Sequence, residues 1–526
     1  MTSLQEWTEG LRSSLHPLLF AGVYKAAAKL GDSWGLSTFA HPDFLVAAPK
    51  LLQAIFAAAM DFATYKLATR VYGANSRNAY AALFLTVLSP WQAFCSVRTL
   101  SNSTETTLTV IALHLWPWDW FAAKSAATKG SGLTEPQGTR SPPGMDSSPP
   151  SSLYSSLAAA ALACVLRPTN IIVWATVSST LLIRFGSFSK LFSLAQAALL
   201  SGGAILALSA SADRAFYCDW ILPPLRFLQF NLIQSLAVFY GKNRPDYYFT
   251  EGLPLLLTTA TLFAIVGLWT SLRREAEKTE PAEQRARIIR PTLAAAVVST
   301  VGLLSLISHK EVRFIYPLLP MLHVLAAKPL AAFFSPFPAP SGNIRRALLL
   351  LMICINIAIA WYTVLVHQRG VIDVVDYLRQ KHEDTPHSAN GSTTIGFLMP
   401  CHSTPWRSHL VHSDTRAWAL TCEPPINLTM SERESYRDEA DVFYDDPAAW
   451  IHANMRWDYP GPKPAPDYLV FFEQLEPQLE VIFQDEALDR YVQDRQFFNT
   501  HWHDDWRRQG DIIVWRRENE IVCYDD

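Results

Sequence analysis

The chain has 526 residues, of which 50% are hydrophobic and 17% are charged, and its formal net charge at pH 7 is −3. This near-neutral charge gives no sign of nucleic-acid binding, and the uneven distribution of apolar residues argues against a string of ordinary soluble domains. Between Phe44 and Val366, apolar runs of roughly 15–20 residues recur, the length that a helix needs to cross a bilayer. We therefore expect a mainly α, multi-pass membrane helix bundle followed by a soluble C-terminal domain.

The apolar runs give a series of candidate membrane segments. A weaker run at residues 15–30 precedes them and could lie in the membrane interface. The candidates in chain order are residues 44–60, 79–94, 106–121, 153–165, 171–183, 191–208, 253–269, 292–307, 315–333 and 347–366.

The distribution of basic residues orients these segments. Cytosolic loops of membrane proteins carry an excess of Lys and Arg, and residues 273–290 form such a loop. Counting crossings from this loop places residues 309–313, residues 213–252 and the whole tail in the lumen. Residues 122–152 are rich in Ser, Pro and Gly, which predicts a disordered cytosolic linker.

Three regions follow from this topology. Residues 1–43 are predicted to be a luminal or interfacial N-terminal segment, residues 44–367 a transmembrane domain, and residues 368–526 a luminal domain. The topology places the N-terminus in the lumen, yet residues 1–10 contain no signal peptide. Either the run at residues 15–30 inserts unconventionally or an upstream membrane helix is absent from this chain, and we favour the second explanation.

The tail alternates strand-like runs with acidic helical stretches, which predicts a small α/β domain. The strand-like runs are TTIGFLMP, DYLVFF and DIIVWRR. Cys401 and Cys422 lie in this tail and could pair in an oxidising lumen, although buried unpaired thiols are the usual alternative. No two of the seven cysteines have the CxxC spacing of metal or redox sites.

The segment HKEVR lies between two apolar runs. His309, Lys310 and Arg313 can all donate hydrogen bonds to an anionic group, and Glu311 can hold one of them in place. The alternative is a charged turn that snorkels to the lipid headgroups. The loop is too short for a solvated linker and its charge opposes the positive-inside trend, so phosphate binding is our hypothesis.

Other luminal segments share this polar and basic character. The residues concerned are Arg12 and His16 in RSSLHP, Arg98, Asn102 and Glu105 in RTLSNSTE, Arg167 in LRPTN, and Tyr240 and Lys242 in FYGKNRPDYYFTEGLP. Each motif alone has a structural explanation, such as a helix break or a helix cap. Together on one membrane face, they predict a cavity for an anionic lipid headgroup that carries a sugar.

The motif HKEVRF resembles the HKExRF signature of the dolichyl-phosphate-mannose-dependent α-mannosyltransferases, which are glycosyltransferases of the polyprenyl-phosphate-sugar type. The other luminal motifs are similar to further landmarks of that family, in the same order. The tail stretches LMPCHSTPWRSHLV and DEADVFYDDPAAWI resemble the branch that adds the third mannose, by an α-1,2 link, to the GPI-anchor precursor.

The resemblance implies an inverting mannosyltransferase of the endoplasmic reticulum membrane, with dolichyl-phosphate mannose as donor and a dimannosyl GPI precursor as acceptor. His309, Lys310 and Arg313 would bind the leaving phosphate, and neither a metal nor another cofactor is expected. A carboxylate must take the proton of the attacking hydroxyl. The family carries an acidic motif upstream of the segment that matches RSSLHP, so we expect this base to be absent from the chain and the chain to need it for activity.

Two other classes of function stay open at this point. One is a related mannosyltransferase of GPI or N-glycan assembly, which the LMPCHSTPW stretch argues against. The other is a non-catalytic transporter or membrane scaffold. A transporter would be expected to show inverted repeats and charges near the middle of the membrane.

Overall fold

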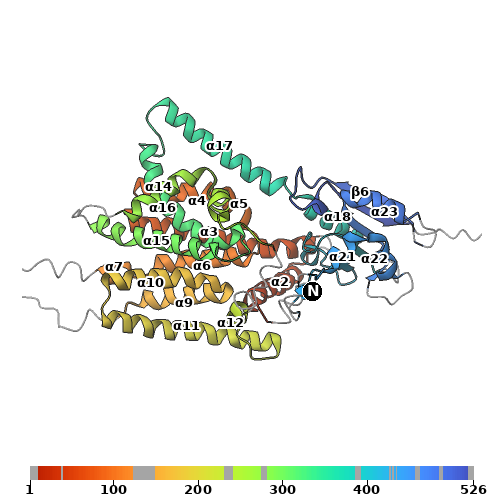
Figure 1. Ribbon diagram of the computed structural model, residues 1–526, viewed down its shortest axis with the longest axis horizontal. Helices are drawn as coiled ribbons and strands as arrows, with labels where there is room; N and C mark the ends of the chain where they lie inside the picture. The colour runs from red at the N-terminus through yellow and green to blue at the C-terminus, as the bar shows by residue number, and fades with distance from the viewer. Residues whose placement is uncertain are drawn as a thin grey trace, which may run out of the picture. The chain divides into compact units, whose positions relative to one another are not determined.

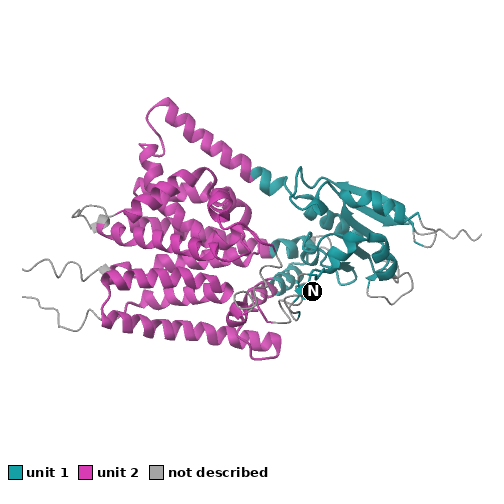
Figure 2. Ribbon diagram, in the orientation of Figure 1, with its two compact units in different colours: residues 1–9, 24–48, 361–526 teal, residues 10–23, 49–360 magenta. Residues whose placement is uncertain are grey.

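The computed structural model describes residues 10–36, 40–122, 149–229, 241–273, 281–384, 392–423, 425, 428, 432–433, 435–456, 463–484, 488 and 490–518. Tyr240 and most of the predicted linker at 122–152 lie outside these residues. The chain divides into two compact units (Figure 2). A helical unit contains Gly10–Val23 and Pro49–Ala360, and a tail unit contains Tyr24–Ala48 together with Trp361–Asp526.

Helices make up the first unit, and three of them extend into the residues of the second (Figure 1). Their bounds are α2 Leu15–Ser33, α3 Ala40–Tyr72, α4 Arg77–Val87, α5 Pro90–Cys95, α6 Ser101–Leu115, α7 Trp118–Ala122, α9 Ser151–Leu166, α10 Ile171–Phe185, α11 Phe188–Tyr217, α12 Pro223–Leu228, α13 Leu253–Leu257, α14 Thr261–Leu272, α15 Pro281–Ser305, α16 Leu319–Phe333 and α17 Asn343–Leu365. Short helical turns η1 Pro168–Asn170, η4 Tyr248–Gly252, η5 Thr258–Ala260 and η6 Val312–Leu318 connect some of them.

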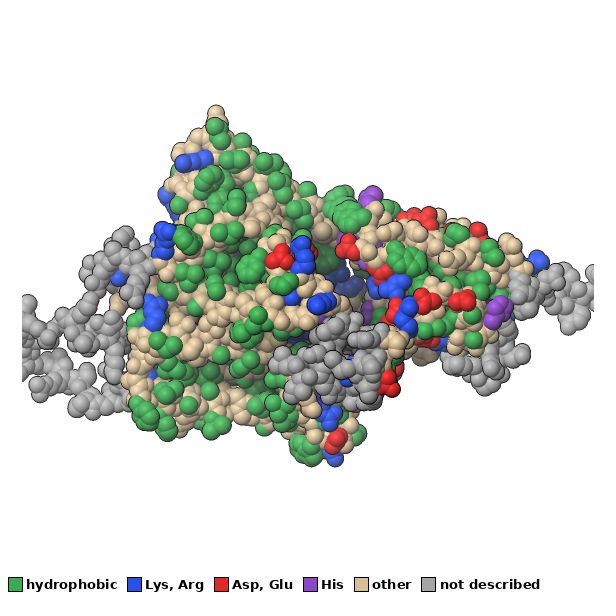
Figure 3. Space-filling model, in the orientation of Figure 1, with side chains coloured by type: hydrophobic (Ala, Val, Ile, Leu, Met, Phe, Trp, Pro, Cys, Tyr) green, Lys and Arg blue, Asp and Glu red, His purple; other side chains and the backbone are tan. Residues whose placement is uncertain are grey.

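Length and composition confirm the predicted membrane helix bundle. Among the described residues, 6 helical stretches are long and apolar enough to cross a membrane. They are His41–Tyr72, Phe188–Tyr217, Tyr248–Leu272, Gln284–Ser305, Val312–Phe333 and Asn343–Asp384. Apolar side chains cover much of the visible flank of the helical unit, and Lys and Arg side chains gather along its left edge (Figure 3). A lipid-facing flank with basic residues at one end is typical of a multi-pass protein.

Several predicted boundaries were wrong. The run at residues 79–94 is not one helix, because Ser89 caps a new helix whose first residue is Pro90, and proline cannot continue a preceding helix. The run at 106–121 breaks at Pro117 for the same reason, between α6 and α7. The run at 44–60 is part of a helix that continues to Tyr72, because charged residues such as Lys66 are good helix formers.

Helix α16 forms the centre of the helical unit, and the structure buries most of its residues. It packs against α14, α15 and α4. Close approach to α14 depends on Gly267, where an added Cβ atom would lie 2.3 Å from the carbonyl oxygen of Leu325. This packing fixes the position of the HKEVRF segment, which leads directly into α16.

The tail unit is the predicted small α/β domain. Its helices are α18 Gly370–Asp384, α19 Trp406–His409, α21 Glu439–Asp445, α22 Pro447–Asn454 and α23 Glu476–Ile482, and its strands are β1 Thr394–Phe397, β2 Arg416–Ala419, β3 Met455–Arg456, β4 Lys463–Pro464, β5 Tyr468–Phe472, β6 Tyr491–Phe497 and β7 Ile512–Arg517. The main sheet has the order β2-β1-β5-β7-β6. Strands β1 and β2 are parallel, as are β1 and β5, whereas β7 is antiparallel to both β5 and β6.

The three strand-like runs of the sequence form the centre of this sheet as β1, β5 and β7. In β5, Leu469 and Phe471 belong to one buried cluster, and Val470 and Phe472 belong to another. Because successive side chains of a strand point to opposite faces, the central strand is covered on both sides. Burial on both faces explains why this run is continuously apolar rather than alternating.

Candidate active site

Glu311 organises the HKEVR loop, which follows α15 and whose last two residues begin η6. Its Oε1 atom is 3.1 Å from Nε2 of His309 and accepts a 2.7 Å hydrogen bond from Nη2 of Arg313. Burial alone would raise the pKa of Glu311, but the hydrogen bonds from His309 and Arg313 and their charges lower it to about 2. Glu311 therefore holds two of the three predicted phosphate ligands, and it remains ionised at any physiological pH.

The three predicted cations differ in their exposure. The Arg313 side chain is 45% exposed, whereas Lys310 is only 3% exposed. The Nζ atom of Lys310 donates to the carbonyl oxygen of Asn243 at 3.5 Å, and its backbone N–H donates to the side-chain oxygen of Asn243 at 2.7 Å. The N–H of Asn243 in turn donates to the carbonyl oxygen of Ser308. Asn243 thus joins the GKNRP loop to the HKEVR loop, and Arg313 offers the most accessible guanidinium.

The RTLSNSTE segment contacts the same loop. Asn102, near the start of α6, donates through Nδ2 to the carbonyl oxygen of Arg313 at 3.0 Å. The guanidinium of Arg98 lies over the ring of Phe94, 3.9 Å from its centroid, and donates to the carbonyl oxygen of Phe94. Both contacts hold the approach to α6 in place. Because the Asn102 side chain is buried, we assign it a structural role, which is to join the RTLSNSTE segment to the HKEVR loop.

Glu105 and Arg167 form a buried polar group at the next turn of α6. Asn170 donates to Oε1 of Glu105 at 2.9 Å and to Thr109 at 2.9 Å, and Nε of Arg167 lies 3.9 Å from Oε2 of Glu105. The indole N–H of Trp174 donates to Asn170 at 2.8 Å, which orients its amide. The guanidinium of Arg167 also lies over the ring of Phe314, 5.1 Å from its centroid. The LRPTN and HKEVRF segments therefore meet at this ring.

The charges of separate segments act on Arg167. Burial lowers its pKa to about 10, Glu105 and Glu311 oppose this shift, and Arg12 and Arg313 add to it by repulsion. Cations from RSSLHP, LRPTN and HKEVRF thus lie close enough to influence one another. A group of cations of this kind is unfavourable by itself and favours an anionic ligand.

Arg12 is positioned by a buried acid that the sequence did not single out. Asp213, near the end of α11, accepts hydrogen bonds from the backbone N–H and the hydroxyl of Ser14 at 2.6 and 2.7 Å. It also accepts from Ser13 at 3.2 Å and from Ser209 at 2.9 Å. The Tyr217 hydroxyl donates to the carbonyl oxygen of Arg12 at 2.6 Å. Asn170 and Asn243 lie inside the predicted motifs and Asp213 lies outside them, and all three were missed because no local pattern marks a distant partner.

Not every predicted residue joins this group. Lys242 is exposed on its loop, and Tyr240 lies outside the described residues. The ring of His16 packs edge-on against Phe20 on α2, with the centroids 5.0 Å apart. These residues remain predictions, whereas Glu105, Asn102 and Arg167 have direct contacts with the HKEVRF segment or with each other.

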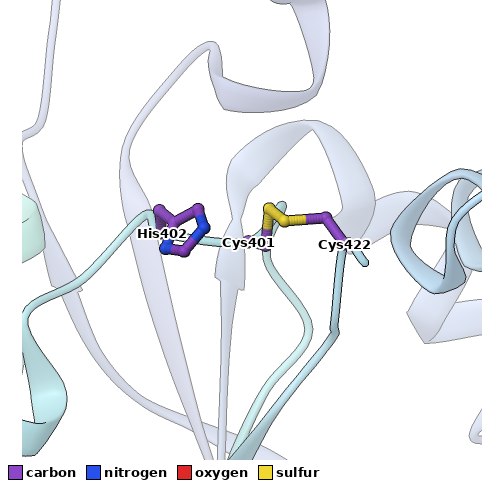
Figure 4. A group of neighbouring side chains, drawn as sticks. All are labelled: Cys401, His402 and Cys422. Atoms are coloured by element: carbon purple, nitrogen blue, oxygen red, sulfur yellow. A yellow bond between two sulfur atoms is a disulfide. The ribbon is translucent and has the colours of Figure 1, made fainter. Parts of the chain in front are cut away.

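Cys401 and Cys422 form a disulfide in the tail unit, and their Cα atoms lie 5.9 Å apart (Figure 4). His402 lies beside this bond, and one of its ring nitrogens lies within 4.8 Å of the sulfur atoms. A metal site with thiolate ligands requires free sulfur atoms, which the disulfide does not provide. The pair therefore acts as a crosslink between the segment after β1 and the segment after β2.

Comparison with known proteins gives a consistent result. Residues 4–411 match the Alg9-like mannosyltransferase family. The chain is similar to GPI mannosyltransferase 3 of Aspergillus fumigatus, with 45% identity over 97% of this chain and 71% of the relative. Identity with GPI mannosyltransferase 3 of Gibberella zeae is 41%, covering 97% and 86%. Identity with GPI alpha-1,2-mannosyltransferase 3 of Mus musculus is 32%, covering 97% and 80%.

A solved structure shares the fold. The crystal structure of ArnT from Cupriavidus metallidurans bound to undecaprenyl phosphate has a TM-score of 0.53 and 12% sequence identity. The likeness covers 96% of this chain and 88% of that protein. Because the identity is so low, the likeness concerns the fold alone. It confirms the predicted type of fold, a membrane glycosyltransferase helix bundle with a small C-terminal domain.

Proposed function

The chain belongs to the Alg9-like mannosyltransferase family, and from this premise we propose that it adds the third mannose to the GPI-anchor precursor. The bond formed is an α-1,2 link, the donor is dolichyl-phosphate mannose and the acceptor is a dimannosyl GPI glycolipid. The printed names of the fungal and mouse relatives support the GPI acceptor and the α-1,2 linkage. The HKEVRF motif and the tail stretch LMPCHSTPWRSHLV support the donor and the choice of the third mannose.

The observation that carries this proposal is the meeting of distant basic segments at the HKEVRF loop. Arg313 is accessible, and the guanidinium of Arg167 lies over the ring of Phe314, next to Arg313, from a sequence position far away. Glu311 neutralises part of this charge but leaves the guanidinium of Arg313 half-exposed. Guanidinium groups suit phosphate because they donate two parallel hydrogen bonds to its oxygens. This arrangement fits a phosphate that bears a lipid on one side and a sugar on the other.

The chemical step is a single displacement with inversion at the anomeric carbon of mannose. The 2-hydroxyl of the acceptor mannose forms the new glycosidic bond while the bond to the phosphate oxygen breaks. The negative charge that develops on the departing dolichyl phosphate is stabilised by Arg313, with His309 and Lys310 as further donors. This stabilisation counts most in a site with little water, since charges interact more strongly there.

The proton of the attacking hydroxyl requires a carboxylate base. Two acids belong to the described cation group, and both are already engaged. Glu311 accepts from His309 and Arg313, and Glu105 accepts from Asn170 beside Arg167. Their contacts give each a positioning role, so we assign the general base to neither.

The same proposal includes the location of the site. We place the HKEVRF loop and the tail unit in the lumen of the endoplasmic reticulum, because the Lys- and Arg-rich loop at residues 273–290 belongs on the cytosolic side. A disulfide between Cys401 and Cys422 is compatible with an oxidising lumen.

The test is a mannosyl-transfer assay with Arg313→Ala. Microsomes from cells that lack the third-mannose activity would carry the parent or the variant, and conversion of dimannosyl to trimannosyl GPI would be measured. Loss of one donor to the developing charge predicts a rate roughly 100- to 1000-fold lower. Arg345→Ala, a change at an exposed arginine that the proposed topology places on the cytosolic side, is the matched control and retains the parental rate. Equal rates for Arg313→Ala and the parent would refute the role of this loop.

A further inference from the structure

A second group of chemically active side chains lies in the tail unit, and the proposed mannosyl transfer does not use it. His382 is near the end of α18, and His412 and Asp414 lie in the segment between α19 and β2. One possible ligand atom from each of the three lies within 4.8 Å of the others. His382 is buried, His412 is half-buried and Asp414 is exposed, so the group reaches from the domain interior to its surface.

Neighbouring side chains fix the orientation of both rings. Nδ1 of His382 lies 2.8 Å from the hydroxyl of Thr393, and its Nε2 lies 3.1 Å from a carboxylate oxygen of Asp414. Nε2 of His412 lies 2.9 Å from Oε1 of Glu383, and the centroids of the two rings are 5.1 Å apart. Histidines that bind metals usually have one ring nitrogen on the metal and the other hydrogen-bonded to a carboxylate, a carbonyl or a hydroxyl.

The distances suit a small tetrahedral ion. Bonds of about 2.0–2.1 Å from zinc to nitrogen or oxygen place neighbouring ligand atoms roughly 3.4 Å apart. The nitrogen–oxygen distance of 3.1 Å between His382 and Asp414 is close to this value. Two imidazoles and a carboxylate favour zinc over calcium or magnesium, which prefer all-oxygen sites.

We propose that His382, His412 and Asp414 bind a structural zinc ion in the tail unit. Glu383 lies outside this group of three. Its carboxylate oxygen, 2.9 Å from Nε2 of His412, is the hydrogen-bond partner that orients the ring, which leaves Nδ1 of His412 for the ion. This site departs from the expectation of a metal-free protein, and it is independent of the proposed mannosyl transfer.

The position of the site in the fold explains what the ion does. Strand β2 has only 4 residues and lies at the edge of the sheet that the described residues form, next to β1. The segment that carries His412 and Asp414 leads directly into β2, while His382 belongs to α18. An ion bound by both segments fastens the start of the edge strand to α18. The disulfide Cys401–Cys422 fastens the segment after β2 to the segment after β1.

A network of ion pairs without metal is the competing explanation. Protonated His382 would pair with Asp414, and protonated His412 would pair with Glu383. Arg379, which lies 3.6 Å from Glu383, already supplies one positive charge to this network. Both explanations place two further positive charges near Arg379, either two imidazolium ions or one zinc ion, so charge alone does not distinguish them and the metal content does.

Metal analysis of the purified protein separates these explanations. The full chain, purified in detergent without a polyhistidine tag and dialysed against metal-free buffer, is expected to contain about one zinc ion per chain, since structural sites bind tightly. His382→Ala and His412→Ala should each reduce the zinc content at least fivefold. His452→Ala, which removes an exposed histidine on α22, is the matched control and keeps the parental content.

Thermal unfolding gives a second readout that does not depend on the alanine variants folding normally. A chelator should lower the Tm of the parent, and added zinc should restore it, whereas calcium and magnesium should not. Asp414→Asn changes a half-exposed position. This variant should need at least tenfold more zinc than the parent to restore its Tm after chelation. A parent that contains no zinc and whose Tm does not respond to added zinc would show an ion-pair network only and would overturn the proposal.

Discussion

Glu311 shows how one side chain determines the properties of its neighbours. It accepts hydrogen bonds from His309 and Arg313, which lie on either side of it in the sequence. Because these donors lower its pKa from 4.5 to about 2, the carboxylate stays ionised and the two donors stay oriented. The stabilising contribution of a carboxylate with a lowered pKa is present above its ordinary pKa and is lost only as the pH falls toward the lower value.

We predict that Glu311→Gln lowers the rate of mannosyl transfer roughly 10- to 100-fold, because hydrogen bonds to charged groups contribute about 1.5–3 kcal/mol. The loss should be the same between about pH 6 and pH 8, since Glu311 does not titrate in that range. The rate would be measured in the microsome assay at several pH values. A pH-dependent difference between variant and parent would contradict the assigned ionisation of Glu311.

At the scale of elements, Asp213 fastens the start of α2 to the end of α11. The carboxylate is fully buried and accepts from Ser13, Ser14 and Ser209. Residues Ser14 and Asp213 are 199 positions apart in the chain, so this contact closes a long loop. The position of Arg12, next to Ser13, depends on it.

We predict that Asp213→Ala destabilises the helical unit by about 2–4 kcal/mol, because buried donors that lose their acceptor cost about 1–3 kcal/mol each. The donor KM should rise as well, since Arg12 loses its fixed position. Both are measurable on the purified protein, as the Tm in detergent and as transfer rate against donor concentration. Ser211→Ala, an exposed residue on the same helix, is the control and should change neither. Parental Tm and KM in Asp213→Ala would exclude this anchoring role.

Elements also show where sequence prediction reaches its limit. The apolar runs located the long helices, because hydrophobicity along a segment is a local property. Their ends were less certain, since a cap such as Ser89 or a proline such as Pro117 divides a run that is apolar throughout. In the tail, the runs that became β1, β5 and β7 were identified, but their order in the sheet depends on pairing between distant strands.

At the scale of the whole molecule, the orientation in the membrane is the property to test. We predict that a cysteine at Ile344→Cys reacts with a membrane-impermeant maleimide in sealed microsomes, because the proposed topology places the adjacent Arg345 and Arg346 on the cytosolic side. A cysteine at Val481→Cys, in the tail unit, should react only after the membrane is permeabilised. Both positions are highly exposed, at 78% and 69% respectively.

The labelling needs a background without other reactive thiols, in which Cys218→Ser, Cys354→Ser and Cys523→Ser are combined. The Cys401–Cys422 pair stays in place as a disulfide. Reaction of both introduced cysteines in sealed microsomes, or of neither, would refute the proposed topology. Agreement would place the tail unit in the lumen with the donor phosphate site.

The amino-acid sequence by itself determined the class of the protein, the existence of the tail domain, the polar and basic motifs and the family resemblance. These are properties of short segments, namely length, hydrophobicity, charge and spacing. Only the tertiary structure decided which motifs meet, such as Asn102 with Arg313, 211 positions apart, and Lys310 with Asn243. It also revealed Asp213 and the group around His382, for which no local pattern exists. The physical reason is that hydrogen bonds and charges act over a few ångströms in space, so that helix and strand packing alone decides their partners.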